Sequence, residues 1–515
     1  MIGFTVSVGL DLKGPRGRVL NGRRSSTGGV VVSATAADGG NVKKADTLVV
    51  GSGVSGSSLA FALHKKGLNV LMTEARDRIG GNVITKQENG YTWEEGPNTF
   101  QPAPHIMRMA VDLGLKDDVV LADHTLPRFV FWNGKLFALP LGPSDIPKFR
   151  LLSPWGFIRA GLGAIGLVMP NTSGKEESVK EFVTRHLGKE VYERIIDPFV
   201  SGVYAGNPMS LSMSAAFKKI FALEQLGSTN GLIEGGIIRL QQRKKEAPPP
   251  DPELPTYKGG ALGSFKNGLI SLPKAVVEKI GSDNVKLEWK MESIETDEDG
   301  NFVTKFQTPS GTETVLSKTV ALTAPAYIAS GLLEPLIGPS AKRLDEINYP
   351  CVYSVNLGYR KEAFKTPLKG FGNLIPRSMG ITTLGTIWSS CLFPGRAPEG
   401  MELLLSYIGG AQNDKIAGQT ADEVCAQVHN DVKNILLKDD PDIEPVVLGV
   451  RKWERAIPQA NLGYKSILND VEEAKDKFPG LFLGGNYVSG VAFGDCVLWG
   501  VETAEAVEKQ LKATH

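Results

Sequence analysis

One stretch of the chain, residues 48–74, constrains its fold more than any other, because three glycines stand between apolar runs. The outer runs are typical of buried strands, and the segment after the glycines favours a helix. Gly51 would allow a tight bend, Gly53 would admit a pyrophosphate to the backbone, and Gly56 would let the helix lie against the strand. The positive end of that helix would then face the phosphates. The stretch predicts a dinucleotide-binding unit, and glycines that only permit tight packing are the alternative.

The residues after this unit indicate which dinucleotide. Glu74 closes the second strand where an acid accepts the two hydroxyls of an adenosine ribose. From there the chain reads Glu-x-x-x-Arg-x-Gly-Gly, an extension that nicotinamide enzymes do not need, with Arg78 available for a phosphate. A second Gly-Gly bend suggests backbone pressed against a long, extended cofactor. A further tight turn at 93–98 is expected if loops enclose a flavin ring, so the pattern favours FAD.

A second strand-to-glycine turn lies near the C-terminus, where residues 481–486 lead into a helix from about Gly494. A helix N-terminus beside a flavin stabilises its reduced form. The predicted cofactor-binding residues are therefore Gly51, Gly53, Val54, Ser55, Gly56, Glu74, Ala75, Arg78, Gly80, Gly81, Asn82, Gly96, Pro97, Asn98, Gly485, Asn486 and Val491.

Length and composition exclude several classes of protein. At 515 residues the chain exceeds one ordinary core, so two or more domains are expected. Its 57 Lys and Arg against 56 Asp and Glu leave no basic excess for nucleic acid, which favours a small-molecule partner. The 4 cysteines form no Cys-x-x-Cys pair, which argues against zinc and against a secreted disulfide scaffold. The 6 histidines are scattered, so neither a metal site nor a histidine-based triad has support.

Two segments of the chain indicate where in the cell the protein is expected to be. Residues 1–44 are rich in Lys, Arg, Ser and Gly, hold only Asp11 and Asp38 as acids, and lack the apolar core of a secretory signal. They predict an organellar transit peptide, with a disordered tail as the alternative. No stretch reaches the roughly 18 uninterrupted apolar residues of a membrane span. The apolar segment 151–169 suits an interfacial helix, a hydrophobic tunnel wall or a plain buried helix.

The rest of the chain alternates between strand and helix patterns. Asn133-Gly134 between two alternating runs predicts a hairpin over 128–138. A helical region follows over roughly 150–240, in which Ser178 and Glu181 form a capping-box pattern. Residues 241–258 are charged and proline-rich and are expected to form an exposed connection. Beyond them, 319–325 reads as a buried strand, and Cys351, Tyr353, Val355 and Leu357 would share one strand face.

Six stretches together resemble the protoporphyrinogen IX oxidase family, in particular its plastid branch in plants and algae. They are residues 74–82, 96–98, 197–206, 384–390, 393–398 and 484–487, and the similarity extends over nearly everything after residue 45. The resemblance implies FAD-dependent oxidation of protoporphyrinogen IX to protoporphyrin IX in haem and chlorophyll synthesis. Oxygen would be the acceptor and hydrogen peroxide the second product.

The resemblance also implies a mixed α/β (α+β) architecture in three parts. The first is a discontinuous, Rossmann-like FAD domain of the p-hydroxybenzoate-hydroxylase type, over 45–110, 259–330 and 450–515. The second is an α+β substrate domain over 111–150 and 331–449, and the third is a helical membrane-associated domain over 151–240. A plastid location with peripheral or monotopic membrane attachment follows, and a homodimer is left open.

Carried over by position, five residues are expected to contact the tetrapyrrole. Arg128 resembles the arginine that pairs with a propionate, a task that suits the bidentate, always-charged guanidinium. Leu374, Ile387 and Tyr407 match positions that hold the macrocycle, and the Tyr407 hydroxyl would need a partner. Gly202 is assigned to the catalytic site and to substrate binding, because its backbone would face the substrate. An ordinary hairpin charge, for Arg128, and simple core, for the others, are the alternatives.

Two departures from the family pattern affect the cofactor. Asp495 stands where related sequences often carry a basic residue; it could cap a helix or oppose a reduced anionic flavin. Ser57 and Ser58 make the first helix more polar than usual, which is expected to loosen its packing slightly.

Three other functions share parts of this pattern. A flavin amine oxidase or a carotenoid desaturase carries the same Glu-x-x-x-Arg-x-Gly-Gly motif, although an amine substrate would favour an aromatic cage or an acid in place of Arg128. A non-redox module similar to prenyl-protein escort proteins would keep the fold without a flavin and would be colourless.

Overall fold

The computed structural model describes residues 42–167, 171, 174–246, 249 and 251–513, so the predicted transit peptide lies almost wholly outside the described residues. The chain forms two compact units. The first holds Asn82–Ser271 and Ile347–Lys465; the second holds the described residues up to Gly81, with Leu272–Glu346 and the C-terminal part from Ser466. Both units therefore contain pieces of the predicted FAD domain, whereas the predicted helical domain belongs to the first unit alone.

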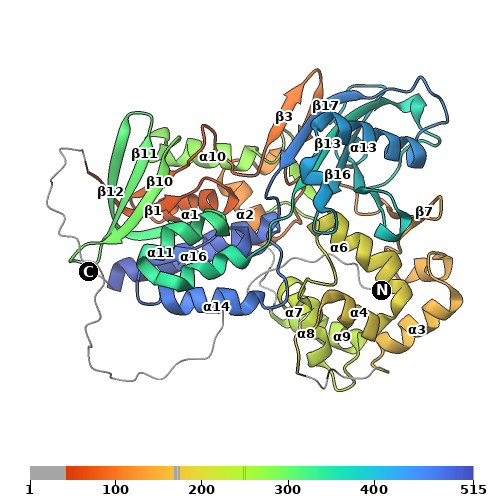
Figure 1. Ribbon diagram of the computed structural model, residues 1–515, viewed down its shortest axis with the longest axis horizontal. Coiled ribbons are helices and arrows are strands. Elements are labelled where there is room, and N and C mark those ends of the chain that lie inside the picture. The colour runs from red at the N-terminus through yellow and green to blue at the C-terminus, as the bar shows by residue number, and fades with distance from the viewer. Residues whose placement is uncertain (1–41, 168–170, 172–173, 247–248, 250, 514–515) are drawn as a thin grey trace. The chain divides into compact units, whose positions relative to one another are not determined.

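The second unit is built on a sheet of seven strands in the order β10-β11-β12-β1-β2-β9, with β18 paired to β12. Strands β1, β2, β9, β12 and β18 run parallel, and β10 and β11 extend the sheet antiparallel. Figure 1 shows this sheet at the left with its helices alongside. The bounds are β1 Lys43–Val50, β2 Val70–Thr73, β9 Val285–Lys286, β10 Lys290–Thr296, β11 Phe302–Thr308, β12 Gly311–Leu322, β18 Leu481–Leu483, α1 Val54–Lys65, α10 Ser271–Ile280, α11 Ala326–Ile337, α14 Tyr464–Lys475, α15 Asn486–Ser489 and α16 Phe493–Ala513.

The predicted strand, helix and strand at the start of the chain are confirmed as β1, α1 and β2. The polar character of α1 does not loosen it as expected. Ser58 is fully buried, and a Cβ added to Gly500 of α16 would lie 2.7 Å from the Ser58 Cβ, so the two helices are in close contact. The Ser57 hydroxyl is satisfied by donating to the Ser52 carbonyl at 2.9 Å.

The first unit contains a second seven-stranded sheet, in the order β17-β13-β16-β15-β14-β6-β7. Helix α13 covers one face, where Val424, Val428 and Val432 pack on Tyr353, Val355 and Leu357. The face predicted for that strand is therefore confirmed. The bounds are β6 Arg128–Trp132, β7 Lys135–Ala138, β13 Val352–Arg360, β14 Gly372–Leu374, β15 Thr383–Trp388, β16 Met401–Gly409, β17 Val446–Trp453, α12 Ser389–Leu392 and α13 Ala421–Leu436.

Smaller elements surround this sheet. Strands β3 (Thr85–Glu88) and β4 (Tyr91–Glu94) form a hairpin, β5 (Val119–Leu121) pairs with β8 (Gly263–Phe265), and α2 spans Pro104–Asp112. The predicted turn at 93–98 thus begins as a strand, since Trp93 and Glu94 end β4. The predicted Asn-Gly hairpin is confirmed: Asn133 and Gly134 have φ of 47° and 78°, as the favoured two-residue turn requires.

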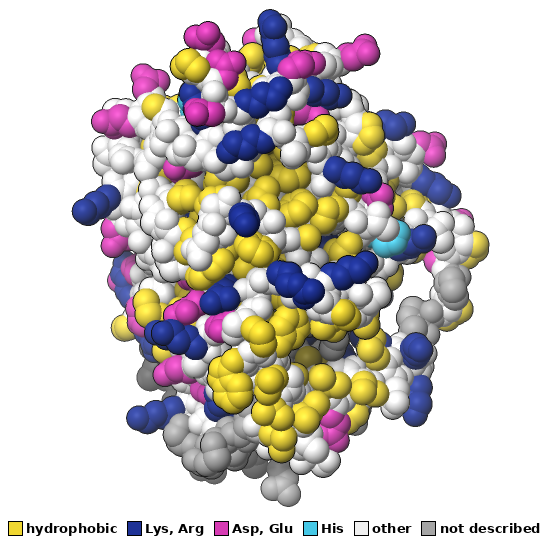
Figure 2. Space-filling view, turned by 90° about the vertical axis from the view of Figure 1, so that its right-hand side faces the viewer, with side chains coloured by type: hydrophobic (Ala, Val, Ile, Leu, Met, Phe, Trp, Pro, Cys, Tyr) yellow, Lys and Arg dark blue, Asp and Glu magenta, His cyan; other side chains and the backbone are white. Residues whose placement is uncertain are grey.

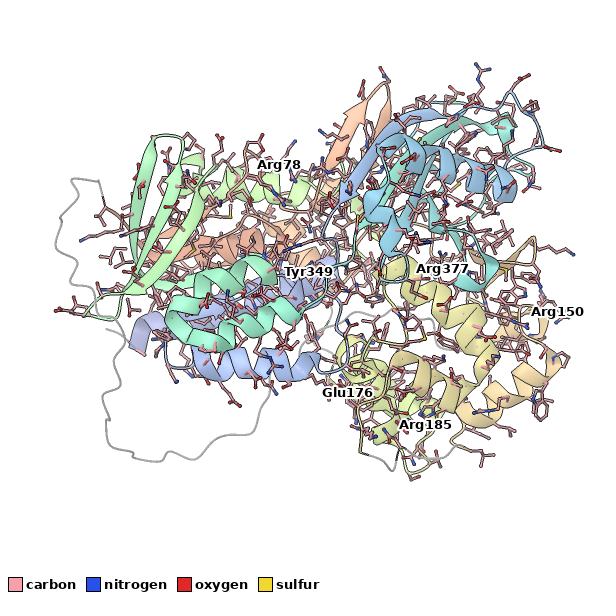
Figure 3. The ribbon with its side chains drawn as sticks, viewed as in Figure 1. Arg78, Arg150, Glu176, Arg185, Tyr349 and Arg377 are labelled. Atoms are coloured by element: carbon pink, nitrogen blue, oxygen red, sulfur yellow. The ribbon has the colours of Figure 1, made fainter. Side chains whose placement is uncertain are left out.

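The helical region of the first unit is also as predicted. It comprises α3 Pro154–Ala164, α4 Val179–Leu187, α5 Lys189–Val191, α6 Asp197–Tyr204, α7 Met213–Ala216, α8 Lys218–Leu226 and α9 Leu232–Glu246, with a π-helical turn at Tyr192–Ile196. The Ser178 capping box is confirmed, with reciprocal hydrogen bonds between Ser178 and Glu181. Arg185, labelled in Figure 3, ties α4 to α8 by pairing with Glu177 and Glu224.

The sequence left two segments of this region partly open. Helix α9 continues to Glu246, so the predicted exposed connection begins with a largely exposed helical segment at 241–246. The apolar segment 151–169 forms α3, followed by exposed residues as far as Leu167; its last two residues lie outside the described part. In the part of the chain that the structure describes, no helix combines the length and apolar character that crossing a bilayer requires.

Candidate flavin and substrate sites

The glycine turn after β1 has the geometry that a dinucleotide site needs. Gly51 has φ of 105°, a conformation that L side chains rarely adopt. A Cβ on Gly56 would lie 1.9 Å from the Gly51 carbonyl oxygen, so only glycine lets α1 begin this close to the strand. The predicted roles of Gly51 and Gly56 in bending and close packing are confirmed.

The Gly80-Gly81 pair packs against the glycine turn at 51–56. A Cβ on Gly81 would lie 3.0 Å from the Gly53 Cα, and the Gly80 N–H donates to the Ser52 carbonyl at 3.1 Å. Helix α1 starts without a side-chain cap and without an acid in its first turn. Its positive end is therefore left for an anion, which fits the pyrophosphate of a dinucleotide.

Glu74 is buried directly beneath this turn. Its carboxylate accepts hydrogen bonds from the Ser52 N–H at 3.0 Å, the Ser52 hydroxyl at 2.7 Å and the Arg76 N–H at 3.1 Å. A carboxylate offers about four acceptor positions, so about one remains for a ribose hydroxyl. Arg78, labelled in Figure 3, contacts the Ile79 carbonyl at 3.4 Å, and its role toward a phosphate stays a prediction.

The C-terminal turn of the second unit also matches its prediction. Strand β18 runs into Gly485, with φ of 96°, and α15 begins at Asn486. Asp495 is buried in the first turn of α16, where a carboxylate interacts favourably with the helix dipole. These turns, with Val54, Ser55 and Ala75 beside them, fit an extended dinucleotide.

The sheet of the first unit brings the predicted substrate residues together. Arg128 lies beside Gly372, and Gly372 lies beside Ile387. One step along the same face, Leu374 lies beside Gly385, and Gly385 lies beside Tyr407. Because paired residues share a face and every second residue returns to it, Arg128, Leu374, Ile387 and Tyr407 all point to the same side, opposite α13.

Arg128 is the predicted substrate-binding cation on this face. Its guanidinium donates to the Gly260 carbonyl at 3.1 Å and lies 5.5 Å from the centre of the Phe371 ring. Among the residues that the structure describes, no carboxylate lies within salt-bridge distance of it. Burial lowers the pKa of Arg128 from its usual value, yet a guanidinium stays charged at physiological pH. A half-buried cation with unused donors suits an anionic ligand.

The hydroxyl of Tyr407 has the partners that the sequence left open. It donates to the Gly96 carbonyl at 2.9 Å and accepts from the Asn98 amide at 3.1 Å. Burial raises the pKa of Tyr407 to about 12, so the hydroxyl stays neutral. A Cβ on Gly96 would lie 2.0 Å from the Asn82 carbonyl oxygen, so the 96–98 turn, with Pro97 in it, is held close to the chain at Asn82.

Helix α6 closes the end of the same face. A Cβ on Gly202 would lie 2.4 Å from the Leu374 Cδ2 and 3.4 Å from the Leu384 carbonyl oxygen. The helix is fixed there by Asp197, which accepts a hydrogen bond from the Arg377 N–H at 2.9 Å. The Arg377 side chain, seen between α6 and the sheet in Figure 3, donates to the Ile375 and Thr383 carbonyls at 2.7 Å each. Gly202 thus contacts a predicted substrate residue.

Comparisons with known proteins agree with this geometry. The model of the family described as "Flavin containing amine oxidoreductase" matches residues 54–508. The chain belongs to the flavin-containing amine oxidoreductase family. It is 48% identical over 498 residues to Protoporphyrinogen oxidase 1, chloroplastic, of Arabidopsis thaliana, covering 94% of this chain and 92% of the relative. It is 48% identical to Protoporphyrinogen oxidase, chloroplastic, of Oryza sativa subsp. japonica, covering 93% and 90%.

Solved structures of flavin amine oxidases and related enzymes share the fold. Cyclohexylamine oxidase from Brevibacterium oxydans IH-35A superposes with a TM-score of 0.64 at 18% identity, covering 91% of this chain and 99% of the other. UDP-galactopyranose mutase gives a TM-score of 0.66 at 17% identity, covering 90% and 94%. As a member of the flavin-containing amine oxidoreductase family, the chain is an FAD-dependent oxidoreductase of mixed α/β fold.

Two charged residues of this family member were not singled out by the sequence. Glu94 ends β4, and Arg396 follows α12; both are at least nine-tenths buried in the first unit. Arg396 lies inside the stretch 393–398 that carried the resemblance and Glu94 inside the predicted turn at 93–98, but their burial depends on segments far apart in the chain. A charge within a tight, apolar loop motif was the available signal.

Proposed function

We propose that the chain oxidises protoporphyrinogen IX to protoporphyrin IX in the plastid, with oxygen as acceptor and hydrogen peroxide as second product. The names of the plant relatives, both chloroplastic protoporphyrinogen oxidases, support the substrate and the compartment. The observation that carries the proposal is the sheet face on which Arg128 stands, unpaired with any described carboxylate, beside Leu374, Ile387 and Tyr407. A cation without a described carboxylate partner, beside apolar side chains, suits an apolar macrocycle with an acidic side chain.

The residues of this face would bind and orient the substrate. Arg128 would bind a propionate through paired hydrogen bonds, since its guanidinium has donors to spare. Leu374 and Ile387 would contact the pyrrole rings, and Tyr407 would present its ring because its hydroxyl is already bonded. Gly202 would keep the end of the pocket open. Bound FAD supplies the hydride acceptor and passes the electrons to oxygen.

The glycine turns of the second unit would hold the FAD. The N-terminus of α1 and the bare backbone at Gly53 and Gly81 would meet the pyrophosphate, and Glu74 the ribose. The residues from Gly485 to Val491 would lie by the flavin ring. We propose for this part the discontinuous p-hydroxybenzoate-hydroxylase type of FAD domain.

The helical region would attach the protein to one leaflet of a membrane. Trp155, Ile158 and Leu162 are exposed by 71%, 53% and 43% on one face of α3. Ile233, Ile237 and Leu240 are exposed on one face of α9, and a Cβ on Gly231 would lie 2.9 Å from the Ile165 backbone, so the two helices meet. Figure 2 shows hydrophobic side chains gathered low on this side of the molecule. Such a patch is typical of a membrane or protein contact.

The direct test is oxygen-dependent appearance of porphyrin fluorescence when the purified protein meets protoporphyrinogen IX. We expect Arg128→Ala to lower kcat/KM about 10- to 100-fold, because a hydrogen bond to a charged group contributes about 1.5–3 kcal/mol. Arg128→Lys keeps the charge and loses the forked guanidinium, so its kcat/KM should lie between those of the parent and of Arg128→Ala. Arg360→Ala, an exposed arginine of the same sheet, is the matched control. An Arg128→Ala enzyme as active as the parent would contradict the assignment.

A further inference from the structure

A small cavity lies beside the predicted substrate face in the first unit. Its volume is about 20 Å³, and Glu94, Asn98, Ser389, Ile387 and Arg396 are among the residues that line it. Ile387 is a predicted macrocycle contact and Asn98 a predicted flavin contact, so the cavity adjoins both. The sheet face already described does not use Glu94 or Arg396.

Buried polar atoms at this cavity lack partners. Among the described residues, neither the Arg396 Nη1 nor the Asn98 Oδ1 has a hydrogen-bond partner. Arg396 is 4% exposed and donates through its other terminal nitrogen to the Ser264 hydroxyl at 2.8 Å and the Phe265 carbonyl at 3.1 Å. A buried guanidinium nitrogen without a partner costs free energy unless a group in the cavity that Arg396 lines accepts from it.

The volume of the cavity limits which molecule could accept a hydrogen bond from Arg396 there. A cavity needs about 10–15 Å³ to hold one water, which also needs two to four polar partners. The cavity meets the size for one water, and the Arg396 Nη1, the Asn98 Oδ1 and the Glu94 carboxylate supply the partners. A propionate has several heavy atoms and does not fit. Arg396 is therefore not a second carboxylate anchor.

Glu94 is held so that it can take a proton. Its Oε1 accepts from the Leu269 N–H at 2.8 Å and its Oε2 from the Thr85 hydroxyl at 2.7 Å. Burial raises the pKa of the Glu94 carboxyl to about 7, although both hydrogen bonds and the charge of Arg396 pull it back down. The other titratable group that faces it is Tyr407, from β16, which stays neutral. Glu94 can therefore change protonation state near neutral pH.

We propose that Glu94, through one water held by Arg396 and Asn98, receives the pyrrole proton that each oxidation step releases. The inference rests on the proposed function. In each step a methylene C–H bond breaks and its hydride, with both electrons, goes to the flavin. A pyrrole N–H bond then breaks, its electron pair forms the new ring double bond, and the proton passes to the Glu94 carboxylate. Glu94 releases this proton to solvent before the next step, so three steps remove three hydrides and three protons. One further proton moves from the remaining methylene bridge to a pyrrole nitrogen, which leaves four methine bridges and two N–H groups.

The test is the pH profile of flavin reduction by protoporphyrinogen IX, measured anaerobically on the holoenzyme. For the parent we expect the rate to rise with pH through an apparent pKa near 7, since only the carboxylate accepts a proton. Glu94→Gln should lower the rate at pH 8 about a hundredfold and flatten the profile, as loss of general base catalysis does. Its flavin content and KM should stay at the parental level, which a folding defect would not leave intact.

Arg396→Gln provides a second test, in case Glu94→Gln does not fold. Removing the cation takes away an interaction that favours the carboxylate, so the apparent pKa should move to higher pH. A parental profile in flavin-loaded Glu94→Gln, or an unshifted one in Arg396→Gln, overturns the relay. A parent enzyme that oxidises no porphyrinogen at all overturns the proposed function as well, so the two failures are distinguishable.

Discussion

At the scale of single residues, the space around Gly202 is a tight constraint on the predicted substrate face. A Cβ there would lie 2.4 Å from the end of the Leu374 side chain, which can rotate, and 3.4 Å from the Leu384 carbonyl oxygen, an ordinary contact. An added methyl group would therefore push Leu374 into the space assigned to the macrocycle and would disturb the fold little. A side chain at position 202 would therefore change the shape of the predicted substrate pocket more than the stability of the protein.

We therefore predict that Gly202→Ala raises KM for protoporphyrinogen IX about tenfold or more, while the thermal unfolding midpoint changes by only a few degrees. Steady-state kinetics and a thermal melt measure the two quantities. The control is Gly161→Ala in α3, where in the described structure no heavy atom lies within 4 Å of the added Cβ. Parental kinetics in Gly202→Ala would mean that Leu374 does not contact the substrate.

At the scale of helices and strands, the sequence could predict those parts of the site that form within one continuous segment. Local patterns were sufficient for the β1-α1-β2 unit, the Asn133-Gly134 hairpin and the Ser178 capping box, because each is decided by neighbouring residues. The row from Arg128 through Gly372 to Ile387 was not predictable from pattern, since β6 lies far from β14 and β15 in the chain. Resemblance named the residues, and only the sheet register shows that they share a face. Glu94 and Arg396 were missed for the same reason.

The exposed faces of α3 and α9 lead to a prediction about helices. The double variant Trp155→Glu, Ile158→Glu should bind vesicles of plastid-like lipids at least tenfold more weakly, because burying each side chain contributes about 1.5–3 kcal/mol. Co-sedimentation measures the bound fraction, and activity in detergent should stay parental. The matched control, Val446→Glu with Val447→Glu, alters two exposed apolar residues of β17. Equal vesicle binding by both double variants would contradict attachment through α3.

At the scale of the whole molecule, the two compact units carry different predicted sites. The second unit carries the glycine turns, and the first carries the substrate face and the cavity at Glu94. The domain bounds expected from sequence differ from these units at 82–110, 259–271 and 450–465, which belong with the first unit, and at 331–346, which belongs with the second. Compactness depends on contacts between distant segments, which no local pattern reports. The first unit therefore supplies the predicted substrate face together with Arg128, Glu94 and Arg396.

The central claim is that a flavin bound by this chain takes electrons from a porphyrinogen. The most direct measurement is the absorption spectrum of the purified, yellow protein, recorded without oxygen before and after protoporphyrinogen IX is added. The account predicts that the oxidised-flavin band bleaches, returns when air is admitted, and is unchanged by a primary amine such as cyclohexylamine. A protein that is colourless and takes up no FAD, or a band that the amine bleaches and protoporphyrinogen IX does not, would contradict it.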